Sequence, residues 1–120
     1  MGYESRLFIV NTSKVSYDTD APKQAETIAV YDCCVMSPVF VKRFDKPVDF
    51  ALYGCESNRI TEDKYGEPLK YATLDETIAC LERYASEQHY RRVAPILGLL
   101  KTFKENEKEW DNIVVVHYGY

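Results

Sequence analysis

The chain has 120 residues, of which 46% are hydrophobic and 28% charged, and this is the size and composition of one globular domain spanning residues 1–120. A formal net charge of −4 disfavours direct nucleic-acid binding, because such binding depends on clustered Lys and Arg. The apolar runs are shorter than the ~20 residues of a membrane span, and residues 1–6 are polar, so we expect a cytoplasmic protein that does not bind a membrane.

The first half of the chain is dominated by β-type sequence. Residues 6–10 predict a short strand, whereas residues 14–24 are polar and predict a loop. The longest β-type run covers residues 26–36, where one of the two alternating faces is apolar except for Asp32. Residues 48–53 also alternate and predict a further strand.

Residues 59–72 predict a turn or an edge hairpin. Gly66 can adopt a positive φ, and Pro68 cannot donate a hydrogen bond to a central ladder. These two residues separate short β-type segments on either side.

Two helices and a terminal strand follow. Thr73 to Glu76 matches the capping box and predicts a helix over about 74–86. Apolar residues at i, i+3, i+4 and i+7 predict a second helix over about 93–106, with Pro95 in its first turn. Residues 112–118 then predict a C-terminal strand.

Strands come first and helices are grouped late, an order typical of α+β domains rather than of doubly wound sheets. We therefore predict an antiparallel or mixed sheet of about four to five strands, with both helices on one face.

A partner-binding surface is predicted after the second helix. Acidic residues follow the C-terminus of this helix, where the helix dipole disfavours negative charge, and the only tryptophan lies among them. Charges placed against the helix dipole indicate a functional surface. Tryptophan is enriched at interface hot spots. The segment consists of Glu105, Glu107, Glu109, Trp110 and Asp111. The alternative interpretation is a solvated loop.

Ten tyrosines in 120 residues exceed ordinary usage. Tyrosine combines contact area with a polar group and suits binding surfaces, although half-buried sheet positions are the alternative. Five tyrosines lie in or beside expected turns and termini, at positions 65, 71, 90, 118 and 120. Three of them, together with one neighbouring acid, are added to the predicted surface: Tyr65, Glu67, Tyr118 and Tyr120.

Two other functions are kept open. Arg91 and Arg92 begin the second helix and suit the phosphate of a nucleotide signal that the protein would sequester. A small enzyme would use His117 and Asp32, although no spacing places them together and no catalytic motif is present. We therefore assign no catalytic residue.

No metal site and no cofactor are predicted. The chain lacks a CxxC pair, and its two histidines lie far along the chain from any cysteine. Free thiols are expected at the four cysteines, which are Cys33, Cys34, Cys55 and Cys80.

Three segments resemble small uncharacterised proteins encoded by phages and prophages of Gram-positive bacteria. They are residues 1–6 (MGYESR), 62–69 (EDKYGEPL) and 115–120 (VVHYGY). The resemblance implies an accessory protein in the host bacterial cytoplasm that binds a host protein, a defence effector or regulator. Inhibition of a CRISPR effector or another defence system is the function it implies. Apart from the resemblance, we keep a homodimer open as a further association.

Overall fold

The computed structural model describes residues 5–18, 21–32, 41–48, 50–53, 59–87, 90–106 and 112–120. Within these ranges the order of elements is β1 (Ser5–Asp18), β2 (Ala21–Asp32), β3 (Lys46–Pro47), β4 (Phe50–Tyr53), β5 (Arg59–Ile60), β6 (Lys70–Thr73), α2 (Leu74–Glu87), α3 (Tyr90–Asn106) and β7 (Ile113–Gly119).

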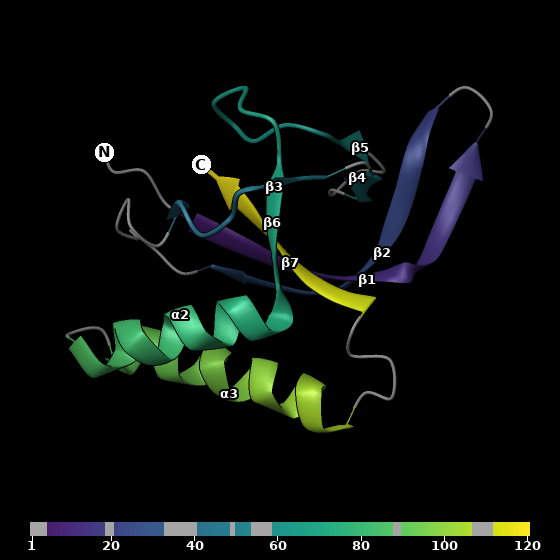
Figure 1. The fold of residues 1–120 in the computed structure, drawn as a ribbon. Helices are drawn as coiled ribbons and strands as arrows, with labels where there is room; N and C mark the ends of the chain where they lie inside the picture. The colour runs from purple at the N-terminus through teal and green to yellow at the C-terminus, as the bar shows by residue number, and fades with distance from the viewer. Residues whose placement is uncertain are drawn as a thin grey trace.

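The described strands form one seven-stranded sheet in the order β3-β6-β7-β1-β2-β4-β5. Every neighbouring pair is antiparallel except β2 and β4, which run parallel. Two strands, β3 and β5, have only two residues each, so five longer strands carry the sheet. Figure 1 shows β7 in the middle and both helices below the sheet. The predicted α+β fold, with two helices on one face and a C-terminal strand, is confirmed.

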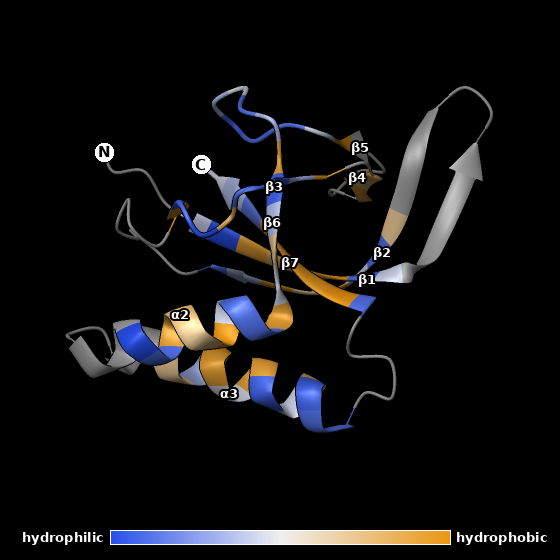
Figure 2. Cartoon of the chain, in the orientation of Figure 1, coloured by the Kyte–Doolittle hydropathy of each residue, from blue (hydrophilic) through white to orange (hydrophobic). Residues whose placement is uncertain are grey.

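The main core lies between the sheet and the helices. Alternate residues of β1 and β7 point toward α2 and α3, because successive side chains of a strand face opposite sides. The fully buried members of this helix-side cluster include Leu7, Ile9, Val115, Leu81 and Leu100. The hydropathy colouring of Figure 2 shows the same division, with orange along β7 and on the inner sides of the helices.

A second cluster covers the opposite face of the sheet. Phe8 and Val10 of β1 and Val114 and Val116 of β7 pack there, and they are covered by residues of β4 and of the segment before β6. Strand β7 is therefore buried on both faces, which explains its continuous run of Ile and Val.

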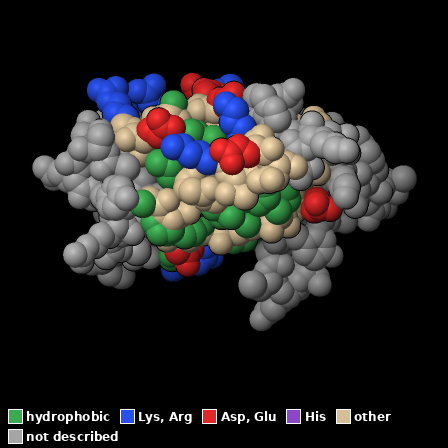
Figure 3. Space-filling view, turned by 90° about the horizontal axis from the view of Figure 1, so that it is seen from below, with side chains coloured by type: hydrophobic (Ala, Val, Ile, Leu, Met, Phe, Trp, Pro, Cys, Tyr) green, Lys and Arg blue, Asp and Glu red, His purple; other side chains and the backbone are tan. Residues whose placement is uncertain are grey.

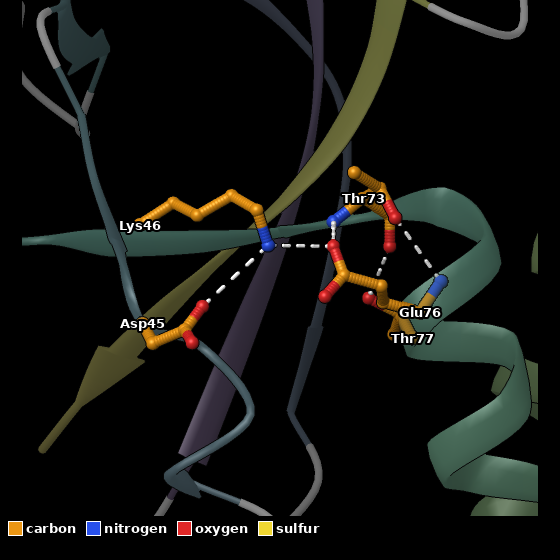
Figure 4. A network of polar contacts seen from close by, with 5 residues as sticks. All are labelled: Asp45, Lys46, Thr73, Glu76 and Thr77. Atoms are coloured by element: carbon orange, nitrogen blue, oxygen red, sulfur yellow. Dashed lines mark hydrogen bonds and ion pairs between the residues drawn. The ribbon is translucent and has the colours of Figure 1, made fainter.

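Strand β6 leads directly into α2 through the predicted capping box. The Glu76 amide donates to Thr73 Oγ1 at 3.1 Å, and the Thr73 amide donates to Glu76 Oε1 at 3.2 Å. Lys46 of the edge strand β3 donates to the same Oε1 at 2.7 Å and approaches Asp45 at 3.5 Å (Figure 4). The Lys46 ammonium lowers the pKa of Glu76, so one carboxylate joins the helix cap to the sheet edge.

We expect Thr73→Ala to lower the free energy of unfolding by about 1 kcal/mol, because the Glu76 amide loses its acceptor at the first turn of α2. Urea denaturation at neutral pH measures this loss. Thr73→Ser keeps the hydroxyl and should stay close to the wild type. Equal losses in both variants would contradict the capping role.

Two predictions of local structure are wrong. Residues 14–18 and 21–24 are not a loop, because β1 extends to Asp18 and β2 begins at Ala21. The second helix does not begin near residue 93 but at Tyr90, so Pro95 lies inside it. A proline at position 95 removes the amide that would bond to the carbonyl of Arg91, and its ring crowds that carbonyl, yet α3 continues through it to Asn106.

Candidate functional site

The turn between β5 and β6 is fixed by its own hydrogen bonds. Asp63 Oδ1 accepts from the amides of Tyr65 at 2.8 Å and Glu67 at 3.0 Å. The Asp63 carbonyl accepts from the Gly66 amide, and the Asp63 amide donates to the Glu67 carbonyl. Gly66 has a φ of 80°, the left-handed conformation that the sequence predicted for it.

This turn is also attached to the end of β7. The Lys64 amide donates to the Gly119 carbonyl at 3.1 Å, which places residues 63–67 beside the C-terminal residues. The side chain of Tyr65 nevertheless stays 56% exposed. We call residues 63–67 the Tyr65 turn; its backbone is fixed at both ends while a large aromatic side chain faces solvent.

A pocket of about 370 Å³ lies next to the Tyr65 turn. One wall comes from the turn itself, another from the segment before β3, and His117 of β7 contributes as well. Acidic, basic and apolar groups all line it: Asp45, Asp63, Glu67, Lys42, Lys70, His117, Val41, Phe44 and Pro68. The carboxylates and the lysines nearly balance, so the pocket does not select strongly for either sign of charge.

His117 forms a buried pair with Ser5. The Ser5 Oγ lies 2.7 Å from the His117 Nε2, and the ring also packs against Phe44 with centroids 5.4 Å apart. Burial lowers the pKa of His117 to about 4, although the nearby Asp63 charge acts in the opposite direction. The imidazole is therefore neutral at pH 7. Ser5 is fully buried, so this pair joins β1 to β7 rather than presenting a nucleophile.

The opposite face of the sheet carries an aromatic and ionic cluster at the same end of β7. The Arg6 guanidinium forms an ion pair with Asp32 and stacks over the Tyr120 ring, 4.3 Å from its centroid. Tyr118 packs edge-on against Phe8 and lies next to Tyr120. These contacts fix the two C-terminal tyrosines in place.

The structure divides the predicted partner-binding surface into two parts. Tyr65 and Glu67 lie in the Tyr65 turn, whose Lys64 amide bonds to Gly119, and Tyr118 and Tyr120 lie at that C-terminal end of β7. Glu67 is exposed. Glu105 is exposed at the end of α3, near the opposite end of β7 (Figure 1). The remaining four residues of that predicted segment lie outside the described residues: Glu107, Glu109, Trp110 and Asp111.

The alternative candidates separate as well. Asp32 pairs with Arg6 in the sheet register and His117 with Leu7, so their side chains project from opposite faces and cannot act together. Arg91 and Arg92 lie in the first turn of α3, with side chains outside the described part of the chain.

The cysteine and metal predictions are tested only where side chains are described. Cys80 is a free, half-buried thiol whose pKa is raised by burial. The other three cysteines, at 33, 34 and 55, fall outside the described ranges. Among the residues that the structure describes, no group of three or more His, Cys, Asp or Glu residues is arranged to hold a metal ion.

Sequence reasoning missed the side-chain contacts around the C-terminal end of β7. The Ser5–His117 pair joins residues 112 positions apart, and nothing local signals it. The Arg6–Asp32 ion pair likewise depends on strand register. The Tyr65 turn did have a signal, because an Asp three residues before a Gly is typical of a side-chain-capped turn.

Comparisons with protein-family models, curated proteins and solved structures give no match to this chain. Neither helix in the described ranges has the length and apolar character needed to cross a membrane.

Substitution of two glycines by alanine should have opposite effects on stability. Gly66→Ala should cost about 1 kcal/mol, because φ is positive there although the added Cβ would meet Glu62 Oε2 only at 3.6 Å. Gly98→Ala should stabilise by about 0.5–1 kcal/mol, because this glycine lies within α3 and a Cβ meets nothing within 4 Å. Thermal denaturation of both variants measures the two signs. Stabilisation by Gly66→Ala would show that the turn does not require its left-handed conformation.

Proposed function

We propose that this protein is a phage-encoded accessory protein that inhibits a host defence protein, such as a CRISPR effector, by binding it directly in the bacterial cytoplasm. The resemblance of the segments at residues 1–6, 62–69 and 115–120 supports the phage setting. Two of these segments, 62–69 and 115–120, are the ones that meet at the Tyr65 turn and the end of β7.

The observation that carries a binding function is the fixed backbone beneath an exposed aromatic side chain. Ordering a flexible loop on binding costs free energy, and the hydrogen bonds of Asp63 and Lys64 have already ordered the Tyr65 turn. Tyrosine is among the residues most enriched at interface hot spots. The neighbouring Glu67 and the mixed-charge pocket supply polar contacts around this anchor.

The proposal is tested by titrating the purified protein into target-DNA cleavage by a panel of purified CRISPR effectors from Gram-positive bacteria. We expect one effector to be inhibited in proportion to the amount of protein bound, with binding measured in parallel by calorimetry. Unimpaired cleavage by every effector in the panel, without binding to any, would make CRISPR inhibition wrong.

The contact surface is tested with Tyr65→Ala, which should weaken binding by about 2 kcal/mol, or roughly thirtyfold. Tyr65→Phe separates the ring from the hydroxyl, and a small loss would assign the energy to the ring. Leu99→Ala is the matched control, since Leu99 is a 36% exposed apolar side chain on α3. Full affinity of folded Tyr65→Ala would place the contact elsewhere.

A further inference from the structure

The pocket next to the Tyr65 turn is lined by charges of both signs that do not pair with one another. Its cations are Lys42, from the segment before β3, and Lys70, from β6, and its carboxylates are those of Asp45, Asp63 and Glu67. In the part of the chain that the structure describes, neither lysine forms an ion pair, although three carboxylates line the same pocket. These opposite charges are therefore too far apart to bond directly.

The helix side of the molecule shows the more usual arrangement of surface charges. Acidic and basic side chains are interspersed there (Figure 3), and Lys101 of α3 forms an ion pair with Glu82 of α2 at 3.5 Å. Lys70 differs, because its ammonium pairs with no described carboxylate and stays available to a ligand.

Two of the three carboxylates already have partners within the protein. Asp45 approaches Lys46 at 3.5 Å, and Asp63 Oδ1 accepts from two amides of the Tyr65 turn. The Glu67 carboxylate, in contrast, has no hydrogen bond or ion pair with any described residue, and Glu67 is exposed. The pocket thus offers a ligand two unpaired ammonium groups and one unpaired carboxylate.

Apolar and aromatic groups complete the lining. Phe44 and His117 are only 4% and 7% exposed and pack against each other, so they form the inner end of the pocket, and Val41 and Pro68 also line it. Lys70 is the cross-strand neighbour of His117 in the β6–β7 register, which places the lysine beside this inner end. The volume of about 370 Å³ lies near the lower limit of ordinary ligand pockets and suits a small metabolite.

From this lining we propose that the pocket binds a free α-amino acid with an apolar side chain. Such a molecule carries a carboxylate and an ammonium on one carbon atom, so it meets both unpaired signs at once. Lys70 binds its carboxylate, Glu67 binds its ammonium, and its side chain packs against Val41 and Phe44. A simple anion would face three carboxylates and a simple cation two lysines, so a ligand without net charge fits this lining best.

Titration of the ¹⁵N-labelled protein with L-leucine, followed by NMR, tests the proposal. We expect saturable shifts at the amides of Glu67 and Lys70, unchanged signals in α3, and a dissociation constant of about 0.1–1 mM. N-acetylleucine and leucine amide each lack one of the two charges, and glycine lacks the side chain, so all three should bind at least about tenfold more weakly. The absence of saturable shifts up to about 50 mM leucine, or equal binding of either derivative, would overturn the proposal.

Variants of the two charged residues separate the two contacts. Lys70→Met should weaken leucine binding at least about tenfold but leave that of leucine amide unchanged, because the amide has no carboxylate to lose. By the same reasoning, Glu67→Gln should weaken the binding of leucine and not that of N-acetylleucine. The matched control is Lys101→Met, which removes a lysine that does not line the pocket and should bind leucine like the wild type.

Both changed side chains belong to exposed residues, so the variants should fold, which circular dichroism checks. A folded Lys70→Met or Glu67→Gln that binds leucine as tightly as the wild type would overturn the assignment. Tyr65 is not among the residues that line the pocket, and the titration uses the purified protein alone. The result is therefore independent of the proposed inhibition of a host protein.

Discussion

Leu100→Ala should lower the free energy of unfolding by about 2–5 kcal/mol, an effect large enough to unfold part of the population of a domain of this size. Leu100 is fully buried in the helix-side cluster, which also holds Leu7, Ile9 and Val115 of the sheet. Truncation removes three carbon atoms, a methine and two methyl groups, from a contact region that rigid strands and a helix cannot easily close, so a cavity adds to the lost burial.

The adjacent Leu99 provides the matched control. It has the same chemistry and the same helix, but its side chain is 36% exposed, so Leu99→Ala should cost well under 1 kcal/mol. Guanidinium denaturation of the two variants compares them directly. If Leu99→Ala costs as much as Leu100→Ala, the assigned inner face of α3 is wrong.

The helical half of the fold could be predicted because its signals are local. The capping box at Thr73 and Glu76 lies at the start of α2, and the apolar spacing of residues 96–103 identified the inner face of α3. The start of α3 was missed because proline disfavours the helix interior through a lost hydrogen bond and a ring clash, and the structure nevertheless tolerates Pro95 inside the helix.

The long β1–β2 hairpin could not be predicted in full. Its register shifts between Ile9 and Val10, between Asn11 and Val15, and again between Ser16 and Asp18. Each shift breaks the period-two alternation on which strand prediction depends, and the polar residues there resemble a loop. The hairpin is held by ladder hydrogen bonds between strands, and local composition does not report them.

The candidate site was predicted residue by residue but not as an arrangement. Composition indicated Tyr65, Glu67, Tyr118 and Tyr120, and the bond from the Lys64 amide to Gly119 brings the turn that holds the first two next to the end of β7 that holds the others. Glu105 was predicted for the same surface and lies elsewhere, since β7 separates the end of α3 from the C-terminus. Residue type can suggest a contact surface, but topology decides which candidates share it.

The stability of the protein should fall between pH 7 and pH 4 because of His117. The ordinary histidine pKa is 6.5, and burial lowers the folded-state value to about 4. Between these values the unfolded chain binds a proton at residue 117 that the folded chain excludes, so acidification favours unfolding. The stabilising effect of the neutral ring is complete above pH 6.5 and is lost as the pH falls to 4. A pKa difference of this size corresponds to about 3 kcal/mol.

Urea denaturation of the wild type and of His117→Gln across pH 5–7 isolates this contribution. The wild type should lose about 2 kcal/mol more than the variant over that range, since glutamine can replace the hydrogen bond to Ser5 without titrating. The range stays above the pKa of Glu76, which is itself lowered by Lys46 and would add to the loss at lower pH. Measuring the imidazole shifts by NMR in His89→Gln, where His117 is the remaining histidine, should give a midpoint near pH 4. A midpoint near 6.5, with parallel stability curves, would mean that the ring is solvated and that the contact with Ser5 does not exclude water.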